Sequence, residues 1–488
     1  MTPNLEAQHL KVARQFLYDQ AMVYYQGNPV GTVAAIPQKR WVYSQGQLEV
    51  AVPDHDLNYG EVFIRDNVLS MMWFLLDGRD DIVKNFLEVC LQLQSNDPRT
   101  RGIFPTSFYV NHEKLVSDFG QRAIGRVVSV DATLWWPIIV HMYVRKTQDW
   151  DWVHSERVQQ ALTHLLGLVL QPSFREVPTL HVPDGSFMID RPLDVWGSPL
   201  EVQVLLYGAL ISAARLLRQG DPLIAHCLER AIRLRRYLHK HYWLNRRIVQ
   251  TLRRRPTDQY GDDVVNEYNI RTETVPHWLQ EWLNSEGGFL IGNIRTSRPD
   301  FRFFSLGNCL ASIFDILTPP QQRSLFNLIL HNQQDLIGEM PLRICHPPLD
   351  DTDWQNKTGF DPKNRRWCYH NGGHWPCLLP FLIVAVLRHQ QSFLDLRYSQ
   401  TYLPMQELLK KAYQLQMARL PEQKWAEYFD GPTGVWMGQQ ARLYQTWTIA
   451  GLLICHRILI QSPTDSSILD LVPLRSLRDP VMPLHAEE

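Results

Sequence analysis

Segments that are apolar on nearly every side alternate along this chain with segments that are apolar on one side only. The first kind is typical of helices buried on all sides, and the second is typical of helices with one exposed face. In the segment 155–170, for example, Val158, Leu162 and Leu165 recur at helical spacing, while charged and amide side chains occupy the opposite positions. The fully apolar segments are 62–76, 127–144, 199–217, 303–317, 377–388 and 445–461. The amphipathic segments are 4–24, 80–95, 155–170, 221–241, 319–335 and 404–419.

The alternation predicts an all-α fold, an (α/α)6 barrel in which six outer helices surround six inner helices. Closure of the helix pairs into a ring would cover every inner helix. Strand-like stretches are few and short, such as 179–184 and 246–252, so we expect only minor β-hairpins in the connecting loops. An open solenoid of helical hairpins is the structural alternative.

The chain has 488 residues, of which 45% are hydrophobic and 20% are charged, as in ordinary folded proteins. No linker rich in glycine, serine or proline interrupts the helical pattern. We therefore predict a single catalytic domain over residues 1–488, with residues 463–488 forming a peripheral C-terminal tail.

The charges balance, with 49 Lys and Arg against 50 Asp and Glu, so no overall field would attract nucleic acid or an anionic membrane. No apolar run approaches the roughly 18 residues of a membrane span, and the N-terminus lacks the pattern of a signal peptide. The 7 cysteines are scattered and never spaced as CxxC, which is typical of a reducing compartment. These features predict a cytoplasmic protein without a membrane or nucleic-acid partner. Apolar patches on the outer helices would favour a homo-oligomer.

Chemically unusual residues gather in the connections that precede the inner helices. If the inner helices run parallel, these connections meet at one mouth of the barrel, where the helix N-termini also offer free N–H donors. The expected lining contains carboxylates, arginines, amides and tryptophan rings. Such a lining suits a neutral ligand rich in hydroxyl groups.

Glycoside hydrolysis requires one protonated carboxyl, which gives a proton to the leaving oxygen, and one ionised carboxylate, which activates water or attacks the sugar. Asp190 and Glu427 are the candidate pair. Met188 and Ile189 precede Asp190, so apolar surroundings could keep this carboxyl protonated near neutrality. Glu427 would be the partner that deprotonates water. The alternative for each residue is an ordinary surface acid or helix cap.

Two further motifs also have structural alternatives. Arg65 and Asp66 form either a buried ion pair at a helix start or a clamp for sugar hydroxyls. The segment 370–376 (HNGGHWP) is either a tight loop or a ligand contact, since its glycines let the backbone approach a ligand. His370 and His374 have the i,i+4 spacing of metal ligands, but Gly-Gly between them opposes a helix. We therefore predict no metal site.

The aspartate cluster at 350–353 (DDTD) is the strongest sign of a different chemistry. Clusters of the DDxD kind occur in terpene cyclases, which also use helical barrels. Here the cluster follows Pro347-Pro348-Leu349 in a loop, which is a common place for solvated acids. A terpene cyclase is thus a remote alternative. No Walker-type or dinucleotide-type glycine loop and no GxSxG motif is present in the sequence.

Eleven blocks spread along the chain match a known family in sequence and in order. They are EVFIRD, DIVKNFLEVCLQLQS, AIGRVVSVDATLWW, DGSFMIDR, GSPLEVQVLLYGAL, GGFLIGN, DFRFFSLGN, DLIGEMPLRIC, GFDPKNRRWCYHNGGHWP, WAEYFD and RLYQTWTIAG. Through these blocks the chain resembles, over most of its length, the alkaline/neutral invertases of cyanobacteria and plants. The resemblance implies an (α/α)6 barrel, sucrose as substrate, cleavage of the glucosyl C1–O bond with inversion, and neither a metal nor an organic cofactor.

The same resemblance implies roles for individual residues. Asp190 in the MIDR block would be the general acid, and Glu427 in the WAEYFD block the general base. The glucosyl subsite would be lined by Arg65, Asp66, Asp131, Trp136, Asn371, Gly372 and Trp375. Gln203 and Arg442 are candidates for the fructosyl side.

The sequence departs from the family pattern beside both candidate acids. It reads Asp190-Arg191-Pro192-Leu193-Asp194 where DRRMG is expected, His374 replaces a serine, and Ala426 replaces a proline. These departures leave open another α-glucoside as substrate, and a relative that binds sugars without cleaving them. Asp194 is the second candidate for the general acid.

Overall fold

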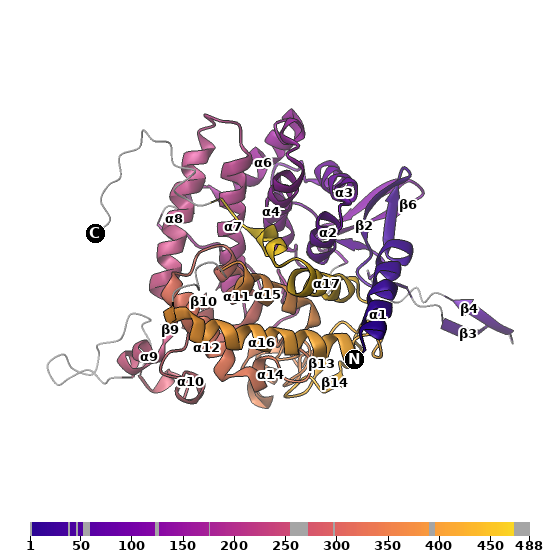
Figure 1. Cartoon of the computed structure of the whole chain (residues 1–488). Coiled ribbons are helices and arrows are strands. Elements are labelled where there is room, and N and C mark those ends of the chain that lie inside the picture. Colours follow the sequence, from indigo (N-terminus) through magenta and orange to yellow (C-terminus); the bar gives the residue numbers. More distant parts are fainter. Residues whose placement is uncertain are drawn as a thin grey trace.

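The computed structural model describes residues 2–37, 40–44, 47–51, 59–122, 126–174, 176–253, 272–295, 298–389 and 396–472. The greater part of the predicted C-terminal tail, residues 473–488, lies outside this described part. Each helix predicted from the alternating pattern is present (Figure 1). The apolar helices are α2 (Asn67–Leu76), α4 (Val130–Thr147), α7 (Leu200–Leu216), α11 (Ser305–Ile313), α15 (Leu379–Leu387) and α17 (Thr446–His456). The amphipathic helices are α1 (Pro3–Gln15), α3 (Asp80–Leu93), α6 (Glu156–Val169), α8 (Leu223–His241), α12 (Pro319–His331) and α16 (Leu396–Arg419).

Burial separates the two sets of helices as their sequences predict. Every residue of α2, α11 and α15 is buried. By contrast, α3 and α8 bury one stripe each, which in α8 includes Cys227, Ala231, Leu234 and Leu238 at helical spacing. An all-round apolar helix needs cover on all sides, whereas the charged face of α8 remains in water.

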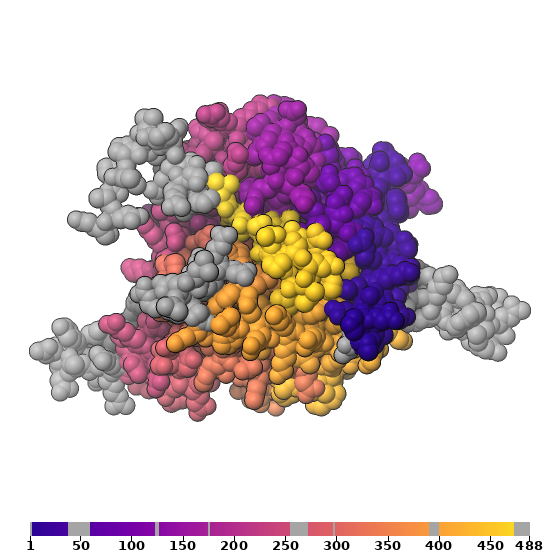
Figure 2. All heavy atoms as spheres, in the orientation of Figure 1, coloured from indigo at the N-terminus to yellow at the C-terminus, as the bar shows by residue number. Residues whose placement is uncertain are grey.

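The apolar helices contact one another in a closed circuit. In chain order α2 contacts α4, α4 contacts α7, α7 contacts α11, α11 contacts α15 and α15 contacts α17, while α17 returns to contact α2. Gly208 allows one of these approaches, because a Cβ there would lie 2.7 Å from the ring of Phe314, just past the end of α11. At the closure the N-terminal helix α1 packs against α17, the last of the apolar helices (Figure 2).

The β-structure is larger than the predicted hairpins. One sheet contains β10 (Gly288–Arg295), β11 (Arg298–Phe304), β12 (Cys345–His346) and β8 (Ser198–Pro199), and β9 (Trp243–Asn245) also pairs with β10. The first six residues of β10 are all buried, so its sequence shows no alternation that would reveal a strand. Among the described residues the other strands form small sheets. The two-stranded sheets pair β1 (Met22–Tyr25) with β2 (Asn28–Thr32), β3 (Arg40–Ser44) with β4 (Gln47–Ala51), and β13 (Phe429–Asp430) with β14 (Trp436–Met437). A three-stranded sheet contains β5 (Val62–Phe63), β6 (Ser107–Asn111) and β7 (Lys114–Asp118).

The two stretches singled out as strand-like are not strands. Residues Arg246–Leu252 form the helix α9, which begins where the Asn245 side chain accepts a hydrogen bond from the N–H of Ile248. In the segment 179–184, Val182 forms only an isolated bridge with Gly197. The N-cap favours a helix over a strand in residues 246–252, because the Asn245 side chain accepts a hydrogen bond from the backbone N–H of Ile248. In a strand this N–H would have paired with a neighbouring strand.

The first part of the predicted tail packs on the helices. Residues Pro463–Leu469 form a short 3-10 helix that contacts α4 and α15. Asp470 accepts a hydrogen bond from Arg388 at 2.6 Å. No helix within the described ranges is long and apolar enough to cross a bilayer.

Candidate active site

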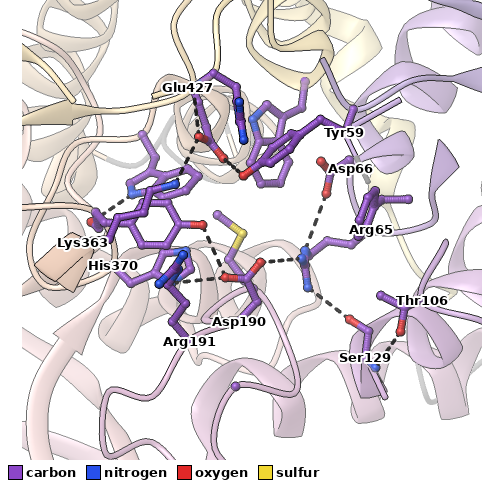
Figure 3. A pocket seen from close by; sticks show the side chains of 18 of the residues that line it. Tyr59, Arg65, Asp66, Thr106, Ser129, Asp190, Arg191, Lys363, His370 and Glu427 are labelled. Carbon is purple, nitrogen blue, oxygen red and sulfur yellow. Dashed lines mark hydrogen bonds and ion pairs between the residues drawn. The ribbon is translucent and has the colours of Figure 1, made fainter. Parts of the chain in front are cut away.

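A cavity of about 570 Å³ opens where five of the connections before the apolar helices meet (Figure 3). Its polar lining residues are Tyr59, Arg65 and Asp66 before α2, Thr106, Arg122, Arg126 and Ser129 before α4, Asp190 and Arg191 before α7, Lys363, Tyr369 and His370 before α15, and Glu427, Gln440 and Arg442 before α17. The rings of Trp375 and Trp447 and the side chain of Met188 add apolar surface. Acids, cations and flat rings therefore face one enclosed space, as the sequence predicts.

The connection before α11 is the exception, and the expectation that all six connections meet at one mouth is wrong for it. This segment is strand β11, and pairing with β10 carries it to a second cavity of about 720 Å³. Arg302 lines the second cavity and pairs with Asp300 at 2.6 Å.

Asp190 points into the first cavity from the connection before α7 (Figure 3). Its Oδ2 lies 3.4 Å from Nη2 of Arg65, and its Oδ1 accepts a hydrogen bond of 3.4 Å from the hydroxyl of Tyr369. The side chain keeps 31% of its surface exposed, so a ligand in the cavity can reach it. Burial raises the pKa of Asp190 above its usual value, although the charge of Arg65 opposes the shift.

Glu427 points into the same cavity from the other side (Figure 3). Its Oε2 accepts a hydrogen bond of 3.3 Å from the backbone N–H of Arg442 and lies 3.9 Å from Nζ of Lys363. Its Oε1 accepts a hydrogen bond of 3.4 Å from the hydroxyl of Tyr59. Burial raises the pKa of Glu427, and Lys363 opposes the shift. With 3% of its side chain exposed, Glu427 is no ordinary surface acid.

Arg65 joins three carboxyl groups at the floor of the cavity. Its guanidinium lies 3.7 Å from Asp66, 3.3 Å from Asp131 and 3.4 Å from Asp190. Burial raises the pKa of Asp66 to about 7, against the opposing charge of Arg65. One guanidinium thus faces three carboxyls, and the raised pKa of Asp66 leaves this residue partly protonated near neutrality.

Stacked rings form the wall next to Asp190. The ring of Trp375 stacks on His370 at 5.0 Å and on Tyr428 at 5.3 Å between centroids. Burial holds the pKa of His370 well below its usual value, so the imidazole is neutral. Its Nδ1 lies 3.7 Å from Oδ1 of Asp190. Flat, partly polar walls of this kind suit sugar rings.

Several residues that the resemblance places at the site lie outside the described lining of the cavity: Asp131, Trp136, Gln203, Asn371 and Gly372. Asp131 is fully buried and faces Arg65 from behind the cavity floor. Trp136 is fully buried and stacks on a phenylalanine ring in the core. Gln203 bonds both the N–H and the C=O of Leu180. Asp131 thus supports the site through Arg65, whereas Trp136 and Gln203 make contacts outside the cavity lining.

Asn371 and Gly372 shape the loop beside Trp375. The amide of Asn371 bonds both the N–H and the C=O of Leu349. Gly372 has φ +92°, a conformation that favours glycine, and its carbonyl accepts a hydrogen bond from Arg343. The loop is therefore fixed by contacts on the side away from the cavity.

Asp194, the second candidate acid, faces the second cavity instead. It forms an ion pair with Arg295, and Nζ of Lys357 lies 3.9 Å from its Oδ2. Only three residues separate Asp190 from Asp194, yet the two carboxyls face different cavities.

The aspartate cluster at 350–353 serves local structure. Asp350 caps the helix α14 (Asp351–Thr358) by accepting a hydrogen bond from the N–H of Asp353. Asp353 in turn pairs with Lys357 at 2.9 Å. Across the part of the chain that the structure describes, no group of three or more histidines, cysteines or acids is arranged to hold a metal ion.

Tyr59, Lys363 and Tyr369 line the cavity but were not singled out from the sequence. Lys363 and Tyr369 lie inside the block GFDPKNRRWCYHNGGHWP, and Tyr59 shortly precedes EVFIRD. The feature of the sequence that could have identified them as site residues is their location in the connections before α2 and α15. Nothing local distinguishes them from other loop residues, because their contacts come from segments far away in the chain.

Comparison with known proteins identifies relatives over nearly the whole chain. Residues 14–463 match the family model described as alkaline and neutral invertase. "Neutral/alkaline invertase 1, mitochondrial" from Oryza sativa subsp. japonica is 39% identical, with 93% of this chain and 71% of that protein covered. "Cytosolic invertase 1" from the same organism is 35% identical, with 93% and 78% covered.

The fold also resembles a solved structure with little sequence similarity. A bacterial glucoamylase complexed with acarbose superposes with a TM-score of 0.51 at 10% identity, covering 96% of this chain and 58% of that one. The likeness concerns the helical fold alone. Its sequence shows that the chain belongs to the alkaline and neutral invertases, an enzyme family of glycoside hydrolases.

Proposed function

We propose that this enzyme hydrolyses sucrose to glucose and fructose at the glucosyl C1–O bond with inversion of configuration. Asp190 is the general acid and Glu427 is the general base. The observation that carries the proposal is the placement of these two carboxyls around one cavity, each with a different set of charged neighbours.

The surroundings of Asp190 suit a proton donor. Burial raises the pKa of Asp190, and Arg65 opposes this shift only in part because it divides its charge among Asp66, Asp131 and Asp190. Proton transfer to the bridging oxygen of sucrose then releases fructose. Asp190 is left ionised beside Arg65, which stabilises its negative charge.

The surroundings of Glu427 suit a proton acceptor. The N–H of Arg442, the hydroxyl of Tyr59 and the charge of Lys363 all favour the carboxylate form. Glu427 takes a proton from the water that attacks C1, on the face opposite to the leaving group. Asp66, which also lines the cavity, steadies the positive charge that develops at the glucosyl ring.

The remaining sequence-based expectations fit the same proposal. The closed circuit of helix contacts supports an (α/α)6 barrel that forms one domain. All 7 cysteines are unpaired, which supports a reducing compartment such as the cytoplasm, and one relative is named cytosolic while another is named mitochondrial. Self-association remains a prediction that sedimentation velocity checks. The acid and the base are both side chains, so the proposed reaction has no step that requires a metal or an organic cofactor.

The test is a substrate screen with purified protein and sucrose, trehalose, maltose or glucosylglycerol. We expect glucose release from sucrose above all others. Release from another α-glucoside alone would overturn the choice of sucrose, which the departures near Asp190 make worth testing. Sucrose binding in calorimetry without glucose release would instead identify a non-catalytic sugar-binding protein.

A further inference from the structure

Lys363 is a buried cation next to the proposed general base. It lies in the 3-10 turn Pro362–Asn364, and 8% of its side chain is exposed. Its Nζ is 3.9 Å from Oε2 of Glu427, and the residue lines the cavity that contains both catalytic carboxyls. An ammonium group so poorly hydrated needs favourable neighbours to remain charged.

Two aromatic faces and one carboxylate provide those neighbours. The Nζ atom lies 4.1 Å from the ring centroid of Tyr369 and 5.3 Å from that of Tyr428, within the range of cation–π attraction. Glu427 is the one acid within ion-pair distance of Lys363 among the described residues. Arg65, in contrast, divides its charge among three acids.

From this arrangement we propose that Lys363 is a positioning residue that keeps Glu427 ionised and aimed at the attacking water. The inference rests on the proposed function and deepens it. The cavity would thereby contain a shared cation beside the acid and a dedicated cation beside the base, which keeps the two proton-transfer roles apart.

Other charged groups near Lys363 are engaged elsewhere. Arg191 forms two hydrogen bonds of 3.0 Å with Asp361. The guanidinium of Arg442 stacks over the ring of Tyr59 at 4.5 Å, while its backbone N–H serves Glu427.

The acids and the imidazole that face Lys363 from the other connections do not replace Glu427 as its partner. Asp190 pairs with Arg65. Asp430 accepts backbone hydrogen bonds from Tyr369 and Gln439, and His370 is neutral. Burial lowers the pKa of Lys363 itself, and Glu427 opposes this shift. Among the nearby cations, Lys363 is therefore the one whose removal should change the pKa of Glu427 most.

The experiment compares Lys363→Met and Lys363→Arg with the wild-type enzyme by measuring kcat/KM for sucrose against pH. Removing an opposite charge raises the pKa of Glu427, so in Lys363→Met the acidic limb should move up by about one pH unit. Below the limb, kcat/KM should fall about tenfold, because one pH unit is a tenfold change in the ionised fraction. Lys363→Arg keeps the charge and should keep the limb in place. Lys84→Met, on the outer helix α3, is the matched control and should leave the profile unchanged.

A merely structural role for Lys363 predicts a different result. Both variants would then lose activity at every pH, with the limb unmoved, and that result would overturn the inference. Glu427→Gln, measured in parallel, separates the two proposals. If Glu427→Gln is inactive while Lys363→Met shows no shift, the role of Lys363 alone fails; if Glu427→Gln is active, the proposed mechanism fails.

A titration makes the result independent of turnover. In protein labelled with ¹³C at glutamate Cδ, the Glu427 resonance can be assigned by its loss in Glu427→Gln. Its pKa should rise by about one unit in Lys363→Met and stay constant in Lys363→Arg. An unchanged Glu427 titration in a folded Lys363→Met protein contradicts the inference whatever the substrate.

Discussion

Nη2 of Arg65 lies 3.4 Å from Oδ2 of Asp190, and the same guanidinium faces two further carboxyls. An ion pair that served Asp190 alone would lower its pKa and leave a poor proton donor. Because Asp66 and Asp131 compete for the same cation, Asp190 can be held in place without being forced to remain ionised. Arg65 thus orients the acid and also receives its charge after proton transfer.

The first prediction concerns the two proposed catalytic carboxyls. Asp190→Asn and Glu427→Gln should each lower kcat for sucrose by about 10²–10⁴-fold or more, because each removes one proton-transfer group. Asp194→Asn should keep kcat within about tenfold of the wild type, since Asp194 faces the other cavity. Glucose release measures all three, and circular dichroism checks the fold. If Asp194→Asn were inactive and Asp190→Asn active, Asp194 rather than Asp190 would be the general acid.

The second prediction concerns stereochemistry. If water attacks from the side of Glu427 while Asp190 protonates the opposite side, the first glucose released from sucrose should be the β-anomer. Proton NMR during the first minutes distinguishes the two anomers before mutarotation. Initial α-glucose would contradict inversion at C1, since both a covalent glucosyl intermediate and cleavage of the fructosyl C2–O bond leave the α-anomer.

The third prediction is a pH-dependent stability effect at Asp66. Burial raises its pKa to about 7, so between about pH 4 and 7 the folded protein binds more protons at this residue than the unfolded chain does. The free energy of unfolding therefore falls as the pH rises through this range. Asp66→Asn cannot ionise, so its Tm relative to the wild type should be higher at about pH 8 than at about pH 5.

Asp300→Asn provides a comparison of opposite sign. Burial acts to raise the pKa of Asp300, but Arg302 outweighs burial and leaves it below the usual value. The ion pair therefore stabilises the fold at neutral pH, and this contribution disappears as the pH falls through the lowered pKa. The Tm deficit of Asp300→Asn should shrink in acid, whereas the relative gain of Asp66→Asn should grow toward alkaline pH. Parallel slopes for both variants would contradict the assignment.

The fourth prediction concerns the geometry of Arg65. Its Nη1 also donates to the hydroxyl of Ser129 at 3.1 Å and to the carbonyl of Phe187 at 2.9 Å. Arg65→Met leaves buried carboxyls without a cation and should lower the free energy of unfolding by about 3–5 kcal/mol. Arg65→Lys should cost less stability but still lose most activity, since one ammonium group cannot reproduce this fork of contacts. Urea unfolding and sucrose turnover measure the two effects separately.

The sequence by itself determined the helical part of the fold and the identity of the principal acids. The pattern of apolar residues predicts how each helix is buried: α2 is apolar on every side and α8 on one side. This prediction does not depend on which segment covers the apolar surface. The sequence motifs also identified Asp190 and Glu427, which both line the cavity.

Only the tertiary structure decided how the chain uses those residues. It brought Asp190 and Asp194 into separate cavities, drew β11 into a sheet with β10, and placed Lys363 beside Glu427. Each of these outcomes depends on distances between segments that are remote in sequence. Charge interactions and strand pairing join segments that are far apart in the sequence. The local residue pattern that predicts a helix therefore does not predict which cation will lie next to a carboxylate, or which strands will pair.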